Sequence, residues 1–459
     1  MTDHILISNL KFNYYPKQPV LDIPKLQIPL HRFIIFYGRS GSGKSTLLKI
    51  IAGLLPKYGG HLSGKVTMPE SEIPAMMFQD PGAQFALDTP RHEIEFALEN
   101  IQTPPSLIKA KVLQALKEVG IMKLADRKFT TLSGGEQQRV TLAVIIAMKR
   151  QIVLLDEPFA SLDINNRKLI INQLIKMQQA GKTIIIADHD LSAYSKLNPV
   201  IIDFNDGVKL LTPVQQQSLL KMSSTPIELN TPLPSNSAPS IITLHHFSLS
   251  RQNQLLINQT ELEIIKNKTT LITGPSGSGK SSFFKAIANL IPYDGSVMLL
   301  DQDLSAYSRS KMGQTLGLVF QHANDQFLNV TVGEEIALSQ RNGRHPYFTN
   351  ERLQRALHDL QLDDFTDHII YSLSGGQKKK LQILIMLMMG QPLLLLDEPF
   401  SGLDRQSIDI VVNLIQRCQK ILPQTILIIS HQLMGALPLV DYHLRLIDQQ
   451  LIYQGADNS

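Results

Sequence analysis

A chain of 459 residues, of which 43% are hydrophobic and 18% charged, has the composition of a globular protein and is long enough for two or three domains. The 44 basic and 40 acidic residues give a net charge of +4 with no long basic run, so the charge pattern predicts no nucleic-acid partner. One cysteine, Cys418, excludes an internal disulfide and fits a reducing compartment.

The first chemical motif follows an apolar run at 33–37 that predicts a buried strand. Residues 38–45 read GRSGSGKS, which matches G-x-x-x-x-G-K-[ST], and a helical pattern follows. Glycines let backbone N–H groups converge on phosphate oxygens, and the start of the next helix adds further donors. We expect Lys44 to contact the β and γ phosphates of ATP and Ser45 to coordinate Mg²⁺. The predicted ATP-binding residues here are Gly38, Arg39, Ser40, Gly41, Ser42, Gly43, Lys44, Ser45 and Thr46.

Further along, a second apolar run at 152–155 ends in Asp156 and Glu157. A carboxylate at that strand end can hold Mg²⁺, and the next one is placed to orient or deprotonate the attacking water. A structural alternative is a pair of acidic strand caps. The segment LSGG at 132–135 is by itself equally compatible with a helix N-cap and a turn.

These landmarks recur in the same order 236 to 242 residues later, which predicts a duplicated domain. The pairs are Gly38 and Gly274, Gln79 and Gln321, Ser133 and Ser374, Asp156 and Asp397, and His189 and His431. Glu398 repeats Glu157. The second predicted phosphate loop comprises Gly274, Pro275, Ser276, Gly277, Ser278, Gly279, Lys280, Ser281 and Ser282, with Lys280 and Ser281 in the roles of Lys44 and Ser45.

Between the repeats, residues 223–240 are rich in Pro, Ser and Thr and predict a linker between domains 1–222 and 241–459. Continuous apolar runs alternate with helical patterns in both halves, which predicts an α/β fold with a parallel sheet covered by helices. The apolar stretch 381–396 is interrupted by Gly390-Gln391-Pro392 and is too short for a membrane span. We predict a buried helix, a turn and a buried strand.

Each half contains, in this order, the phosphate loop, a Phe-Gln pair (78–79 and 320–321), LSGG, an Asp-Glu-Pro segment (156–158 and 397–399) and the histidine at 189 or 431. This ordered set resembles the ATP-binding-cassette (ABC) ATPases, and it occurs twice over nearly the whole chain. The resemblance implies two P-loop NTPase domains, each with a mainly parallel core sheet, an antiparallel β portion and a helical signature subdomain. It also implies that cassettes pair, within one chain or between two. Each site is then completed by the other cassette's signature residues: Ser133, Gly134, Gly135, Ser374, Gly375 and Gly376.

The same resemblance assigns roles to individual residues. It places Gln79 and Gln321 near Mg²⁺ together with Ser45, Ser281, Asp156 and Asp397. It makes Glu157, His189, Glu398 and His431 catalytic, and it puts Asp163 and Asp404 at the cassette seam. Tyr14 is expected to stack on adenine. The equivalent stretch of the second half, 246–251, has no obvious aromatic for this role, and Arg251 is the candidate there. A second departure is Lys378-Lys379-Lys380, where the first half has Gln137-Gln138-Arg139.

The segments after Gln79 and Gln321 are similar to energy-coupling-factor (ECF) importers, which take up vitamins, their precursors or transition-metal ions. This resemblance implies a transmembrane coupling subunit and a substrate-binding membrane subunit as partners, at the cytoplasmic face of a bacterial membrane. The expected partner contacts are Gln84, Phe85, Gln326 and Phe327. A translation-associated or regulatory tandem ABC protein remains the alternative, although the short, nearly uncharged linker favours a transporter.

Overall fold

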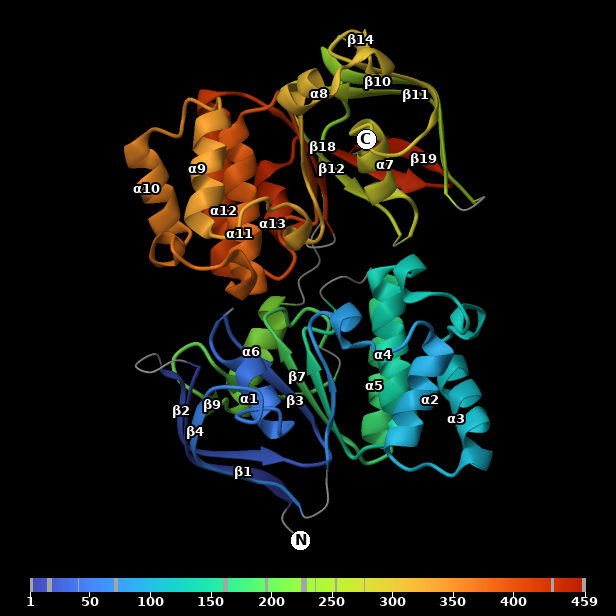
Figure 1. Ribbon diagram of the computed structural model, residues 1–459, viewed down its shortest axis with the longest axis vertical. Coiled ribbons are helices and arrows are strands. Elements are labelled where there is room, and N and C mark those ends of the chain that lie inside the picture. Colours follow the sequence, from blue (N-terminus) through green and yellow to red (C-terminus); the bar gives the residue numbers. More distant parts are fainter. Residues whose placement is uncertain are drawn as a thin grey trace. The chain divides into compact units, whose positions relative to one another are not determined.

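The computed structural model describes residues 3–14, 19–39, 41–69, 73–159, 164–194, 197–223, 229–235, 237–251, 254–275, 277–430 and 433–455. Chain contacts divide the protein into two compact units, Met1–Pro226 and Ile227–Ser459 (Figure 1). The division falls inside the segment that composition predicts to be a linker.

The first unit is built on a six-stranded sheet in the order β5-β6-β7-β3-β8-β9, among the residues described. All neighbours pair in parallel except β8 and β9. Its central strands are apolar on both faces, as expected for a parallel sheet covered by helices. The strands are β3 (Phe33–Tyr37), β5 (Ala75–Met77), β6 (Ile152–Asp156), β7 (Thr183–Asp188), β8 (Val200–Asp203) and β9 (Lys209–Leu210).

A smaller antiparallel sheet and a set of helices complete this unit. The sheet has the order β2-β1-β4 and comprises β1 (His4–Asn13), β2 (Pro19–Pro29) and β4 (His61–Thr67). The helices are α1 (Lys44–Ile51), α2 (Pro90–Asn100), α3 (Pro105–Glu118), α4 (Gly134–Met148), α5 (Ile164–Gln179) and α6 (Pro213–Ser223). The glycine loop connects the end of strand β3 to the start of helix α1.

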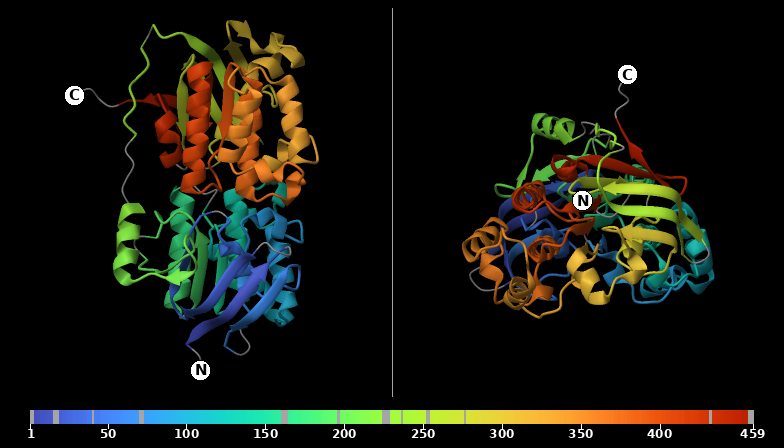
Figure 2. Two further views of the ribbon diagram at one scale, coloured as in Figure 1. Left: turned by 90° about the vertical axis from the view of Figure 1, so that its left-hand side faces the viewer. Right: turned by 90° about the horizontal axis from the view of Figure 1, so that it is seen from above.

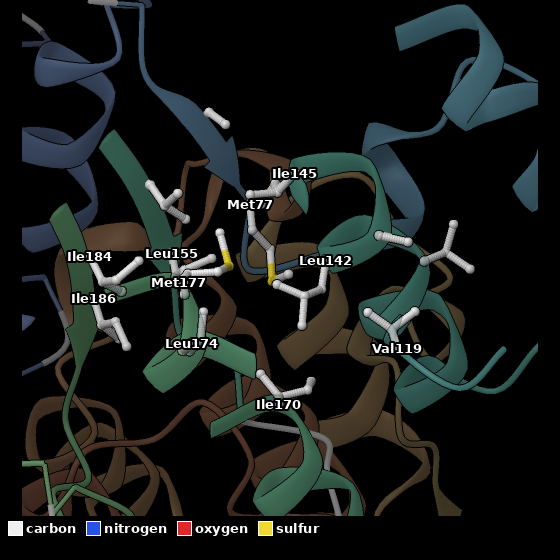
Figure 3. Packing of buried hydrophobic residues seen from close by; sticks show 14 of the residues in the cluster. Met77, Val119, Leu142, Ile145, Leu155, Ile170, Leu174, Met177, Ile184 and Ile186 are labelled. Carbon is white, nitrogen blue, oxygen red and sulfur yellow. The ribbon is translucent and has the colours of Figure 1, made fainter. Parts of the chain in front are cut away.

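One apolar core of this unit lies between the large sheet and helices α4 and α5 (Figure 3). Met77 and Leu155 of the sheet face Leu142 of α4 and Leu174 of α5, and all four are buried. A second core joins the two sheets around α1. The strand end that carries Asp156 is therefore anchored by packing on both faces of the sheet.

The second unit repeats this plan. Its large sheet has the order β15-β16-β17-β12-β18-β19 and its small sheet β11-β10-β13-β14. The strands are β10 (Ser240–Arg251), β11 (Gln254–Ile265), β12 (Thr269–Thr273), β13 (Asp294–Leu299), β14 (Gln302–Asp303), β15 (Leu316–Val319), β16 (Leu393–Asp397), β17 (Thr425–Ile429), β18 (Tyr442–Ile447) and β19 (Gln450–Gln454).

The helices of the second unit are α7 (Lys280–Ile287), α8 (Arg309–Thr315), α9 (Val332–Asn342), α10 (Asn350–Asp359), α11 (Gly375–Met389), α12 (Arg405–Ile421) and α13 (Leu433–Ala436). Figures 1 and 2 show α9 and α10 at one end of this unit and β10 and β11 at the other. The helical group and the antiparallel sheet thus flank the core sheet, as the family resemblance implies.

The apolar stretch 381–396 has the predicted structure. Helix α11 ends at Gly390, whose φ of 67° stops the helix in a left-handed conformation, and buried strand β16 follows. Within the part of the chain that the structure describes, no helix is long and apolar enough to cross a membrane.

The end of the predicted linker associates with the second unit. Leu229 packs against the core of that unit, and the Thr231 hydroxyl donates a hydrogen bond of 3.0 Å to the Gln454 carbonyl. Thr231 is also buried. Residues 229–235 therefore belong structurally to the second unit, although their composition predicts a free connection.

Candidate active sites

The first phosphate loop has the geometry that its glycines predict. Lys44 Nζ donates to the carbonyl oxygens of Gly38 and Arg39, each at 2.7 Å, so the loop curls around the ammonium group. Gly43 has a φ of 93°, and a Cβ there would lie 2.5 Å from Leu21 Cδ2. A side chain at this position is excluded by both conformation and space.

The second loop is built in the same way. Lys280 Nζ donates to the carbonyl oxygens of Gly274 and Pro275, each at 2.8 Å, and Gly279 has a φ of 107°. The Ser278 hydroxyl is buried without a hydrogen-bond partner among the described residues. A cavity of about 280 Å³ adjoins this loop, lined partly by Leu255, Leu256, Pro275, Gly277 and Ser278. Unpaired polar groups beside a cavity are suited to an anionic ligand.

Each loop lies beside a buried aspartate at a strand end. Ser45 Oγ donates to Asp156 Oδ1 at 2.8 Å, and burial raises the pKa of Asp156 to about 6. Burial also raises the pKa of Asp397, whose Oδ1 has no hydrogen-bond partner within the described ranges. A hydroxyl and a buried carboxylate are oxygen ligands of the kind that Mg²⁺ prefers. The residues at both positions therefore fit this ion.

Glu157, the residue after Asp156, lies between two polar side chains. Gln79 Nε2 donates to Glu157 Oε2 at 2.9 Å, and His189 Nδ1 is 3.4 Å from Glu157 Oε1. The His189 contact is an ion pair and not an aligned hydrogen bond, since neither ring nitrogen has a hydrogen-bond partner among the described residues. The structure thus brings together three residues that the family resemblance assigns to one nucleotide site.

The charges of Glu157 and His189 shift each other's pKa. Burial lowers the pKa of His189, but Glu157 and Asp188 outweigh burial and raise this pKa to about 9. Burial raises the pKa of Glu157, but His189 and Lys44 outweigh it and leave this pKa below its ordinary value. The cluster therefore holds an anionic glutamate beside a cationic histidine at neutral pH.

Asp188 and Tyr194 support His189, and the sequence analysis did not single them out. The Tyr194 hydroxyl donates to Asp188 Oδ2 at 2.6 Å, and the backbone N–H of His189 donates to Asp188 Oδ1 at 2.7 Å. Both side chains are buried, and the matching residues of the second unit are Ser430 and Ala436. The only signal in the sequence is this difference between the repeats.

Glu157 and Glu398, the predicted catalytic residues, both have a left-handed backbone. The φ angles are 45° at Glu157 and 49° at Glu398, and each N–H donates to a carbonyl of the neighbouring strand. Non-glycine residues adopt this conformation at a cost of about 1 kcal/mol or more. The same backbone turn thus follows the matching strands β6 and β16 in the two units.

The signature serines are exposed at the starts of two largely buried helices. Ser133 caps α4 and Ser374 caps α11, each in a capping box with the residue three positions later. The structural interpretation of LSGG as an N-cap is therefore confirmed. A helix N-terminus with accessible N–H groups is also suited to a phosphate, so the two roles are compatible.

Tyr14 lies next to the first phosphate loop. Its hydroxyl is 3.3 Å from Thr46 Oγ1, its ring packs edge-on against Phe12, and the residue is 40% exposed. Arg251 is exposed at the end of β10 in the second unit. Ser40, Ser276, Asp163 and His431 lie outside the described residues. Asp404 caps α12, where its carboxylate accepts from the Ser407 N–H.

The four expected partner contacts are half-buried and bonded within the chain. Gln84 bridges Phe78 N and Met76 O, and Phe85 stacks on Phe129 at a ring distance of 3.8 Å. Gln326 Oε1 accepts from Phe320 N, and Phe327 packs on the core of the second unit. The exposed apolar side chains of these segments are instead Leu87, Leu328 and Val330.

Together, a parallel sheet, a glycine loop between strand and helix, and an Asp-Glu pair at the adjacent strand end define a P-loop nucleotide hydrolase fold. The sequence profile described as ABC transporter matches residues 21–160 and 257–401. The chain therefore belongs to the ABC transporter family, carries its ATPase domain twice, and is an ATPase.

Among curated proteins, the chain is similar to one from Bacillus subtilis (strain 168) whose name assigns it provisionally to HMP/thiamine import as the ATP-binding protein YkoD. The two are 27% identical over 503 aligned residues, covering 98% of this chain and 91% of the relative. A provisionally named ABC transporter ATP-binding protein of Streptococcus pneumoniae serotype 4 (strain ATCC BAA-334 / TIGR4) is 28% identical, covering 97% of this chain and 89% of the relative.

Among solved structures, the chain resembles the archaeal ribosome recycling factor aABCE1, crystallised with the ribosomal stalk protein aP1. The TM-score is 0.62 at 20% identity, covering 91% of this chain and 83% of that one. The protein titled RNase-L Inhibitor gives a TM-score of 0.60, also at 20% identity, with the same coverage. At this identity the likeness establishes the tandem fold.

Proposed function

We propose that ATP hydrolysis in both units powers a membrane transport complex, an ECF-type importer of a vitamin, its precursor or a transition-metal ion. The main support is that both units keep the Asp-Glu pair, Asp156-Glu157 and Asp397-Glu398, at matching strand ends. Further support comes from the similarity to the HMP/thiamine import ATP-binding protein over 98% of the chain.

In this proposal the two phosphate loops bind ATP, with Lys44 and Lys280 on the β and γ phosphates. Mg²⁺ would be held by Ser45, Gln79 and Asp156 in one unit and by Ser281, Gln321 and Asp397 in the other. When bound, the ion neutralises negative charge on the phosphates. Thr46 and Ser282 follow the loops and belong to the same binding sites.

Glu157 and Glu398 orient the attacking water and accept its proton. In the first unit, the Gln79 amide and His189 hold the Glu157 carboxylate, and its lowered pKa keeps it unprotonated. His189 and His431 contact the γ-phosphate. The signature segments beginning at Ser133 and Ser374 complete the sites when cassettes pair, in one chain or in two.

The catalytic assignment is tested by changing both glutamates. We expect the double variant Glu157→Gln, Glu398→Gln to hydrolyse ATP about 100-fold more slowly, because the base is lost at both sites. Glu118→Gln, an exposed change on α3, serves as the control and should leave turnover unaltered. Near-normal phosphate release by the double variant would contradict the assignment.

The partner in this proposal is a transmembrane coupling subunit that acts with a substrate-binding membrane subunit. We assign its contact surface to Leu87, Leu328 and Val330, because apolar side chains exposed by 40%, 82% and 61% favour a covering partner. These three residues lie in matching segments, one after Gln79 and one after Gln321. An apolar helix end of the coupling subunit could therefore pack against either segment.

Copurification from membranes tests this surface. Leu87→Glu combined with Leu328→Glu should abolish recovery of the membrane subunits, since a buried unpaired charge opposes docking. Leu210→Glu, at a residue 53% exposed on β9, is the matched control and should keep the complex. Retained binding by the double variant would reject the surface, and cosedimentation with ribosomes would favour the translation-associated alternative.

A further inference from the structure

In the second unit a buried lysine joins the signature helix to the loop that carries Gln321. Lys379 lies on α11, five residues after Ser374, and is 3% exposed. Its Nζ donates to the carbonyl oxygens of Phe320 at 3.2 Å and Gln321 at 3.0 Å. Burying an ammonium group is costly unless such acceptors compensate it, so these contacts hold the loop backbone firmly.

A second side chain of the same helix reinforces the connection. Gln382 Nε2 donates to Phe320 O at 2.9 Å and to Gln326 Oε1 at 3.2 Å, and Gln382 Oε1 accepts from Lys379 Nζ at 3.2 Å. Gln326 Oε1 also accepts from Phe320 N at 3.3 Å. The loop is thus bonded at both of its ends to one buried polar network on α11.

The first unit lacks this network among the residues described. The positions that match Lys379 and Gln382 are Gln138 and Thr141. Gln138 Oε1 is buried without a hydrogen-bond partner, and the Thr141 hydroxyl donates to the Gln137 carbonyl of its own helix. The Gln84 side chain donates to Met76 O on strand β5 and not to α4.

Lys379 is also close enough to Asp397 and Glu398 to interact with their charges. Burial lowers the pKa of Lys379 to about 8, and these two carboxylates oppose the shift. Its ammonium group is bonded to the backbone of Gln321 and is influenced by the charges of both carboxylates. Lys379 itself is not among the residues assigned to ATP, Mg²⁺ or proton transfer, so its removal acts on them through the Gln321 backbone and through the lost charge.

We infer that Lys379 is a positioning residue for ATP hydrolysis in the second unit, fixing the backbone of Gln321 to the signature helix. The Gln321 loop and the start of α11 then move as one body. In the first unit the described residues form no such polar link between the Gln79 loop and α4. The duplicated cassettes therefore differ in how a loop displacement reaches the signature serine.

Hydrogen exchange of the full chain tests the inference directly. In Lys379→Met, exchange in the 320–327 segment should rise about tenfold or more, because charge-assisted hydrogen bonds to its backbone are lost. Exchange in α11 should stay within twofold. Gln138→Met is the matched control in the first unit, and its 78–85 segment should also stay within twofold.

Steady-state kinetics separates positioning from general stability. Lys379→Met should lower kcat by up to about twofold, since the second site loses most of its turnover while the first keeps its own, with KM for ATP within twofold of normal. Lys379→Arg should restore most of the kcat, because a cation again reaches the carbonyls. Unchanged exchange in 320–327, an unchanged kcat, or an equal loss in Gln138→Met would each overturn the inference.

Discussion

The two units carry the same motifs but stabilise them with different side chains. In the first, Glu157 lies between Gln79 and His189, and buried Asp188 and Tyr194 support the histidine. In the second, the positions of Asp188 and Tyr194 hold Ser430 and Ala436, and Lys379 secures the Gln321 loop. The motif residues define the chemistry, whereas the residues around them decide which parts of each unit move and which charges they carry.

The largest expected effect is a pH dependence of the unfolding free energy, which arises from His189 in the first unit. The pKa of His189 is raised from 6.5 to about 9, so its stabilising charge is fully present below pH 6.5 and is lost as the pH rises through 9. The loss amounts to about 3 kcal/mol. The unfolding free energy of wild type minus that of His189→Gln should fall by this amount between pH 6 and 10.

A difference that stays constant across that range would contradict the ion pair. Asp188→Ser, which gives the first unit the residue of the second, should reduce the pH dependence without abolishing it, because Glu157 remains. This variant makes the two units more alike and tests whether Asp188 accounts for part of the contrast.

The next effect concerns nucleotide affinity. Tyr14→Ala should weaken binding at the first site by about 2 kcal/mol, since stacking of a base on an aromatic ring contributes on that scale. Calorimetry with a non-hydrolysable ATP analogue should show a tight and a weak class in the wild type and only weak binding in the variant. Tyr58→Ala, at a residue 72% exposed, is the control and should keep both classes.

The smallest effect is a packing difference between the two Gln loops. Phe85 stacks on Phe129 with an interplanar angle of 5°, whereas Phe327 packs against the apolar core of its unit. Phe85→Leu should therefore lower the free energy of unfolding by about 1 kcal/mol more than Phe327→Leu, because the ring pair is lost. Denaturant titration measures both variants, and equal losses would remove the contrast.

Local sequence was sufficient for the features that depend on glycine and on strand ends. The glycine loops, the carboxylates at the strand ends and the interruption at Gly390 follow from conformational rules that act within a few residues. The residues 381–396 were correctly predicted as helix, turn and strand for the same reason. The duplication added the order of the landmarks, which no single motif supplies.

Contacts between distant segments could not be predicted in this way. The departure at Lys379 is visible in the sequence, but its acceptors lie 58 and 59 residues away in the chain. Gln84 and Phe85 are predicted to contact a partner; in the structure both are half-buried, Gln84 donates to Met76 O and Phe85 stacks on Phe129, while Leu87 is exposed. Side-chain direction in an irregular loop depends on tertiary packing, which sequence spacing does not encode.

The left-handed backbone at Glu157 and Glu398 has a consequence for the stability of each unit. Glycine and asparagine tolerate this conformation better than glutamate, so the catalytic residue is kept against a local preference of about 1 kcal/mol. The same conformation in both halves means that Glu157 and Glu398 each lower the stability of their unit by a similar amount.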